Sequence, residues 1–210
     1  MANIDGMAYR ANEAEQHLER ARQHAQRHGD PLVIARVMMG EALFAMGRNE
    51  LPVARIALDK TLALARQARS DRLSATVLTN LSDLAVRMKR PADALLAVEQ
   101  GLPLARRLGE RRLERALLNN ALLARLVLGQ RAEVRRDFEQ LQALWAADGA
   151  TAEQVGALVE FADALANAKD FAGALEMLHR ERQLSQQLST ARREAAMAEL
   201  RERYQQADQQ

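Results

Sequence analysis

Apolar residues in the segment 91–110 follow a helical spacing. They stand three and four positions apart, at Ala94, Leu95, Val98, Leu102 and Ala105. Pro91 opens the segment and Gly109 closes it, and these residue types favour the first turn and the end of a helix. The pattern therefore predicts an amphipathic helix that buries one face.

The landmarks of this segment return along the chain about every forty residues. The column of Ala94 holds another small or branched residue in each repeat: Ala14, Ala54, Val134 and Ala174. The column of Leu104 is leucine in three further repeats: Leu64, Leu144 and Leu184. The closing glycine recurs as Gly29, Gly109 and Gly149, with Arg69 and Ser189 at the two positions that lack it. Three columns in one register indicate an internal repeat.

The same pattern predicts where the helices lie. We expect them at about 8–28, 31–47, 50–68, 71–88, 91–108, 110–129, 131–148, 151–168 and from 171 to about 207. Short turns join them in pairs, so paired helices are antiparallel. Helix 31–47 fits the register poorly, so we expect about two extra residues in the loop after Gly47 and Pro52 in the next first turn.

The fold class follows from the size of one pair. A single pair of this length cannot bury its apolar face, but stacked pairs form one continuous core. We predict an all-α, right-handed α-solenoid of about four hairpins with a period of about 40 residues, an unpaired first helix and a long C-terminal helix. Residues 1–189 would form the array, and residues 190–210 a helical extension or a linker to a further domain.

The composition supports helices and argues against several classes of protein. Hydrophobic residues make up 48% of the chain and aromatic residues only 3%, which disfavours sheets. There is no cysteine, hence no disulfide or thiolate chemistry. No stretch approaches the length of an apolar transmembrane helix, and the N-terminus lacks the features of a signal peptide. We expect a cytoplasmic protein with no membrane partner.

The chain resembles the tetratricopeptide repeat (TPR) family. The turns leading from Gly129-Gln130 to Val134 and from Lys169-Asp170-Phe171 to Ala174 fit its pattern. The second-helix spacing fits at Ala54 to Thr61-Leu62 and at Ala94 to Gly101-Leu102. The small first-helix residue is present at Ala42, Ser82 and Ala162, while Leu122 departs from it. The resemblance implies an architecture and a binding surface rather than one function, because such arrays serve many partners.

The C-terminal tail allows two interpretations. Its apolar residues keep four–three spacing in two halves, Leu184, Leu188, Ala191, Ala195 and then Met197, Leu200, Tyr204, Ala207, with a phase break between them. The tail is either a solvated or capping helix, or a connector that forms a homodimer through Leu188, Met197, Leu200 and Tyr204. The second interpretation resembles the junction between TPR sensor arrays and the output domains of bacterial GGDEF diguanylate cyclases or histidine kinases.

Residues that could carry chemistry are few. No glycine-rich phosphate loop, metalloprotease motif or nucleophile elbow occurs. His17, His24 and His28 share one helical face, which could hold zinc or nickel, but the interpretation we favour is a polar helix face. The arginine runs lack aromatic residues that would stack on bases, so we expect no nucleic-acid partner. We predict no cofactor, no metal and no catalysis.

The family resemblance implies where a partner would bind. First helices line the concave face of such arrays, and asparagines there often hold a peptide backbone. Asn80 and Asn120 stand at equivalent positions, and Glu160 follows in the next repeat. Around them lie Thr76, Asp83, Arg87, Asn119, Leu123, Asp163 and Asn167. The alternative is that the two asparagines bond neighbouring helices and hold the array together.

We therefore expect a non-catalytic module that binds a protein or peptide on its concave face, as the regulatory TPR region of a larger bacterial signalling protein of the diguanylate cyclase type. The alternative is a stand-alone scaffold or chaperone adaptor.

Overall fold

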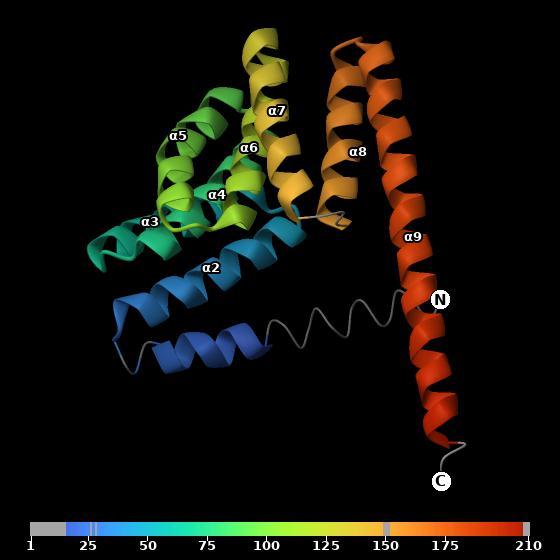
Figure 1. The fold of residues 1–210 in the computed structure, drawn as a ribbon. Helices are drawn as coiled ribbons and strands as arrows, with labels where there is room; N and C mark the ends of the chain where they lie inside the picture. The colour runs from blue at the N-terminus through green and yellow to red at the C-terminus, as the bar shows by residue number, and fades with distance from the viewer. Residues whose placement is uncertain (1–15, 26, 28, 149–151, 208–210) are drawn as a thin grey trace. The chain divides into compact units, whose positions relative to one another are not determined.

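The computed structural model describes residues 16–25, 27, 29–148 and 152–207, and these are helical apart from the short turns (Figure 1). A helical stretch over residues 16–25 comes first. The helices that follow are α2 (Pro31–Gly47), α3 (Leu51–Gln67), α4 (Asp71–Arg87), α5 (Pro91–Arg107), α6 (Arg111–Val127), α7 (Arg131–Asp148), α8 (Ala152–Asn167) and α9 (Phe171–Ala207). The described chain is an all-α array of repeated helix pairs, an α-solenoid; its handedness stays a prediction.

The predicted helix boundaries agree with these bounds to within two residues for all helices after residue 30. One expectation is wrong, because the loop after Gly47 has no extra residues. Three residues separate α2 from α3, as they separate α3 from α4 and α4 from α5. Pro52 does lie in the first turn of α3, as expected. The expected first helix begins at residue 8, so its first half lies outside the described residues.

One type of turn ends the helices at a spacing of twenty residues. A residue in the left-handed conformation follows the helix end at Gly29, Asn49, Arg69, Lys89, Gly109, Gly129 and Lys169. After α3 the N–H of Arg69 donates to the carbonyl of Arg66, and the N–H of Ser70 to that of Ala65. This pair of bonds is the Schellman motif, which satisfies the last carbonyls of a helix. The spacing confirms the forty-residue period of the hairpins.

The chain divides into two compact units, Met1–Ala124 and Arg125–Gln210. The core of the first unit is built on α4, whose buried residues surround almost its whole circumference. Leu78, Leu81 and Leu84 of α4 pack with Leu58 and Leu62 of α3. Small residues bring the backbones close: a Cβ at Gly101 of α5 would lie 3.1 Å from the Cβ of Leu78. Alanine and glycine thus set the tight helix spacing of this unit.

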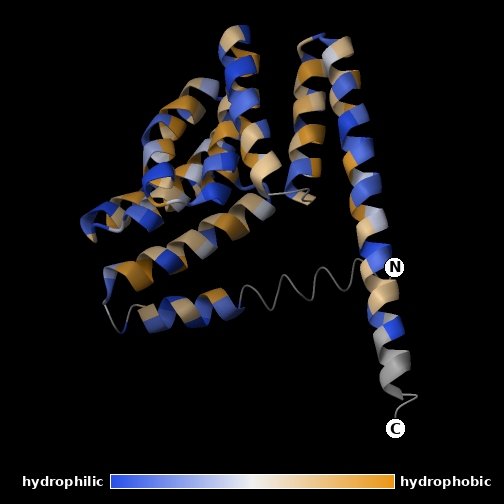
Figure 2. Ribbon diagram, viewed as in Figure 1, coloured by the Kyte–Doolittle hydropathy of each residue, from blue (hydrophilic) through white to orange (hydrophobic). Residues whose placement is uncertain are grey.

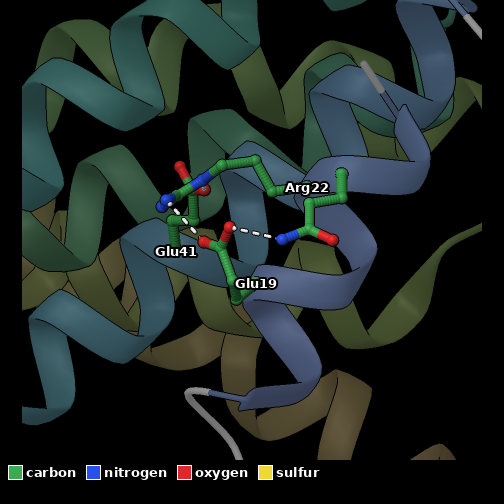
Figure 3. A network of polar contacts seen from close by, with 4 residues as sticks. Glu19, Arg22 and Glu41 are labelled. Carbon is green, nitrogen blue, oxygen red and sulfur yellow. Dashed lines mark hydrogen bonds and ion pairs between the residues drawn. The ribbon is translucent and has the colours of Figure 1, made fainter. Parts of the chain in front are cut away.

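The helical stretch 16–25 covers one side of α2. A Cβ at Gly40 would lie only 2.8 Å from the Leu18 side chain, so the two helices are in close contact there. Arg22 donates to Glu41 at 2.7 Å and to Glu19 at 2.9 Å (Figure 3). The hydrogen bond to Glu41 and the charge of that carboxylate raise the pKa of the Arg22 guanidinium. This contact between α2 and the preceding helix therefore has a polar, charged rim.

The second unit is built from α7, α8, α9 and the end of α6. Leu141, Trp145, Phe161, Met177 and Leu184 are buried in it. Hydrophobic residues are frequent along α8, whereas the later part of α9 is mainly hydrophilic (Figure 2). The predicted boundary between residues 189 and 190 falls inside α9, which continues without a break, so that division stays a prediction.

Candidate partner-binding surfaces

The first helix of the second pair, α4, keeps one narrow accessible stripe. Arg72, Thr76, Asn80, Asp83 and Arg87 stand three and four positions apart and are half-buried or exposed, while most of the helix is buried. Asp83 and Arg87 form an ion pair at 3.1 Å. The Thr76 hydroxyl donates to the carbonyl of Arg72 at 2.9 Å. We call these five residues the α4 stripe; four of them are among the residues predicted for the binding face.

Asn80 lies at the middle of the α4 stripe with part of its amide available. Its Nδ2 donates to the carbonyl of Thr76 at 3.1 Å and approaches the sulfur of Met39 in α2 at 3.5 Å. No donor to its Oδ1 is seen among the described residues. Since a side-chain amide both donates and accepts, Asn80 can accept a hydrogen bond from a ligand without losing these contacts.

Asn120 is the equivalent residue in α6, but its surroundings differ. It is only 7% exposed, and its Nδ2 donates to the Ser82 hydroxyl of α4 at 2.7 Å. Ser82 in turn donates to the carbonyl of Thr79 at 2.7 Å. Leu123 is also buried, and Asn119 is half-buried. Asn120 therefore fits the alternative in which the asparagine bonds a neighbouring helix. It links two successive first helices, α4 and α6.

The predicted residues of α8 lie at the surface of the second unit. Glu160, Asp163 and Asn167 are all exposed. Their spacing of three and four positions places them on one face of the helix. Their role in partner contact therefore stays a prediction.

Two of the four residues predicted for the linker helix, Leu188 and Met197, lie in different surroundings on α9. Leu188 is half-buried and lines a shallow hollow together with Val155 of α8. Met197 is 53% exposed, and no helix covers it in the part of the chain described. The side chains of Leu200 and Tyr204 lie outside the described residues. The phase break noted between Ala195 and Met197 explains the difference, because the two halves of the tail face different directions.

The sequence analysis did not predict a large hollow in the second unit. About 780 Å³ in the second unit is bounded by the end of α6, α7, α8 and α9, with Phe138, Phe161, Leu165 and Met177 among its lining residues. The rings of Phe138 and Phe161 are 5.2 Å apart, and the Arg180 guanidinium lies 5.7 Å from the centre of the Phe138 ring. Apolar walls with charged residues at the edge are typical of binding hollows.

The repeat register explains why this hollow exists. In α5 four residues face the following helix pair: Leu95, Val98, Leu102 and Ala105. We call these positions the stacking row. In α7 the same positions, forty residues on, hold Arg135, Phe138, Gln142 and Trp145. Two leucines are thus replaced by polar side chains that line the hollow. Comparing the columns could have located it.

The predicted histidine face forms no metal site in the described residues. His17 and His24 are exposed, and His28 lies outside the described residues. Across the described ranges no cluster of three or more histidine, aspartate or glutamate side chains is arranged to hold a metal ion. Among the helices described, each is too short or too polar to cross a bilayer.

Comparisons with known proteins identify the fold alone. No protein-family model matches the chain, and no curated protein matches it. Among solved structures, the chain is similar to BtubC (BKLC) from P. vanneervenii, a helical-repeat protein. The TM-score is 0.71 at 15% sequence identity, over 90% of this chain and 78% of that chain. The likeness supports the helical-repeat fold, and at this identity it says nothing about the partner.

Proposed function

We propose that this chain is a non-catalytic interaction module, and that its α4 stripe holds an extended segment of a partner protein. The observation that carries the proposal is Asn80, whose Oδ1 is available at the centre of the only accessible stripe of a buried helix. A peptide N–H can donate to this oxygen in the way the TPR resemblance implies for asparagine at this position.

The flanking charges suit the same role. Asp83 and Arg87 pair with each other at the surface, and such an exposed pair contributes little to stability. Each partner can therefore exchange its contact for a charge on the peptide at small cost. The stripe offers the Asn80 acceptor, one anion and two cations, Arg72 and Arg87, along about four helical turns. This chemistry fits a polar peptide of mixed charge better than a purely acidic one.

The wider role we propose is regulatory. α9 has 37 residues where α3, α4 and α5 each have 17, so it extends well past the last helix pair. A helix of this kind can transmit a change in the array to an output domain, as the resemblance to TPR regions of bacterial diguanylate cyclases implies. A stand-alone scaffold or adaptor in the cytoplasm is the second candidate, and the same α4 stripe would serve it.

The test is a selection of peptides from a displayed random library against the full chain. Selected peptides should bind the wild-type chain at least about tenfold more tightly than the variant Asn80→Ala/Asp83→Ala/Arg87→Ala, since one hydrogen bond and two charged contacts are lost. The matched control is Lys60→Ala/Glu99→Ala, which changes exposed residues of α3 and α5 and should leave affinity unchanged. Equal affinity for all three proteins, or no enrichment of any peptide, would contradict the proposal.

A further inference from the structure

The last helix pair keeps an apolar stacking row with nothing packed on it in the described structure. In α5 the row is covered: Val98 and Ala105 are buried against Leu117 and Ala121 of α6. The same positions in α9 hold Leu175, Leu178, Arg182 and Ser185. Leu175 is 55% exposed and Leu178 is 43% exposed. Leu95 is half-buried and Val98 is buried in α5, whereas the leucines at the same positions of α9 are exposed.

Phe171 extends this surface by one turn. It is 68% exposed and precedes Leu175 by four positions and Leu178 by seven. At about 100° per residue, the three side chains lie within roughly 60° of one another around the helix. The side of α9 that faces α8 is a different one, since Ala174, Met177 and Leu184 are buried. We call Phe171, Leu175 and Leu178 the open row.

An open row of this kind is unusual on a helix pair that ends a repeat array, and the pair α8–α9 is the last one described. Terminal repeats are expected to present a polar outer face, because no further repeat covers them. Three neighbouring large apolar side chains at more than two-fifths exposure instead mark an interaction surface.

The opposite end of the described array is not built to receive this row. There α2 is already covered by residues 16–25, whose outer positions include the exposed residues Glu19, Arg20 and Gln23. Arg22 bridges Glu19 and Glu41 at the rim of that contact (Figure 3). A head-to-tail contact between copies needs two complementary surfaces, whereas a two-fold contact needs only one that matches itself. The open row can match itself in the second arrangement.

We propose that two copies of this chain pair through their open rows about a two-fold axis, with α9 antiparallel to α9 of the partner subunit. Centred on Leu175, the pairing brings each Phe171 against Leu178 of the partner subunit. Leu175 then meets its own equivalent. The open row is self-complementary in this arrangement, because a large side chain at either end faces a large side chain across the axis.

The charge next to the open row suits the same arrangement. Arg182 follows Leu178 by one turn, is exposed and makes no ion pair that the described residues show. Antiparallel pairing centred on Leu175 carries it to the turn between α8 and α9 of the partner subunit. That turn holds the carbonyl end of α8 and the Asp170 carboxylate, which attract a cation, and also the ammonium group of Lys169, which opposes them. The contact covers about four turns of helix, which is small for a protein–protein interface, so we expect a weak dimer that dissociates on dilution.

The first test measures mass in solution by light scattering and sedimentation, over about 1 to 200 µM, where such a dimer dissociates. We expect a dimer for the full chain, and a monomer for Leu175→Asp/Leu178→Asp with unchanged helix content. The matched control is Leu96→Asp: Leu96 is 56% exposed on α5 but lies outside the stacking row, so this variant should still dimerise. A monomer at every concentration for the wild-type chain would overturn the proposal.

A second variant reports the geometry without disturbing the fold. The chain has no cysteine, so Leu175→Cys introduces a single thiol. Pairing centred on residue 175 places the two thiols close enough for a disulfide, and mild oxidation should link the subunits. Leu96→Cys should stay unlinked.

The remaining arm separates this surface from the distal tail. If deletion of residues 190–210 makes the chain monomeric while Leu175→Asp/Leu178→Asp remains dimeric, the tail pairs the copies and the open row does not.

The proposed dimer goes beyond the proposed peptide binding and does not rest on it. Asn80→Ala/Asp83→Ala/Arg87→Ala should dimerise normally, so either proposal can fail while the other holds.

Discussion

Asn80 and Asn120 occupy the same position in successive repeats, yet they have different environments. Asn120 is buried and donates to Ser82, whereas Asn80 is half-buried and its Oδ1 accepts no hydrogen bond that the described residues show. The sequence alone cannot separate these roles, because both residues fall in one column. The difference arises because the preceding first helix, α4, offers Asn120 an acceptor, the Ser82 hydroxyl.

Asn120→Ala should lower the free energy of unfolding by about 1–3 kcal/mol, since it removes a buried hydrogen bond. Asn80→Ala should lower it by less than about 1 kcal/mol, because that residue is partly solvated. Urea denaturation of the two variants checks both values. The double variant Ser82→Ala/Asn120→Ala should lose less than the sum of the single variants, and simple additivity would argue against a direct bond.

A buried ion pair occurs where neighbouring repeats have alanines. Arg125 of α6 and Asp137 of α7 form this pair, with the Asp137 side chain only 4% exposed. The equivalent positions are Ala45 and Ala57 in one repeat, and Ala85 and Ala97 in the next. The ion pair therefore takes the place of a contact between small apolar residues.

Arg125→Ala should cost on the order of 3 kcal/mol of stability, because it leaves the Asp137 carboxylate buried without its cation. Arg125→Ala/Asp137→Ala restores the residues of the neighbouring repeats and should recover part of that loss. Thermal and urea denaturation test this. A double variant less stable than Arg125→Ala would show that the ion pair is not a simple substitute for alanine.

Among the elements, the helix ends were the easiest to predict. Proline or a capping residue starts most helices, and Gly29, Gly109 and Gly129 take left-handed backbone angles at three of the ends. Arg69, Lys89 and Lys169 adopt the same angles without being glycine. The spacing of twenty residues therefore belongs to the repeat rather than to glycine. Asn49 supplies the left-handed residue after Gly47, so the loop expected to be longer, because helix 31–47 fits the register poorly, has the same length as the others.

Arg69→Gly should raise the free energy of unfolding by about 0.5–1 kcal/mol, because glycine adopts a φ of 51° without strain. Gly109→Ala, at a φ of 67°, should lower it by about 1 kcal/mol. Melting temperatures of the two variants should shift in opposite directions. A loss of stability in Arg69→Gly would mean that the arginine side chain makes contacts that outweigh the backbone strain.

Packing between the pairs was much harder to predict than the helices. The hollow beside Phe138 arises from Arg135 and Gln142 in the stacking row, a difference that matters only once the row is known to face the next pair. The orientation of Leu188 towards α8, away from the side of Met197, depends on the rotation of a long helix, which apolar spacing fixes only over a few turns. Local sequence patterns predict the helices, whereas tertiary contacts determine which of their side chains are buried and which are exposed.

At the scale of the molecule, the distal part of α9 adds little to the fold. All residues from 189 to 199 are exposed, so this segment contributes no buried side chain to the second unit. A chain ending at residue 189 should therefore melt within about 3 °C of the full chain, since residues 190–199 are exposed helix. Calorimetry of both chains tests this. A large drop would mean that the tail packs on the array as a cap.

We propose that this repeat array recognises a partner segment through its first helices. The most direct test is to attach a photoreactive group to a peptide selected against the full chain and to map the cross-links by mass spectrometry. The account predicts cross-links to the α4 stripe, around Asn80 and Asp83. Cross-links confined to the outer residues of α3 and α5, or to the open row of α9, would contradict it.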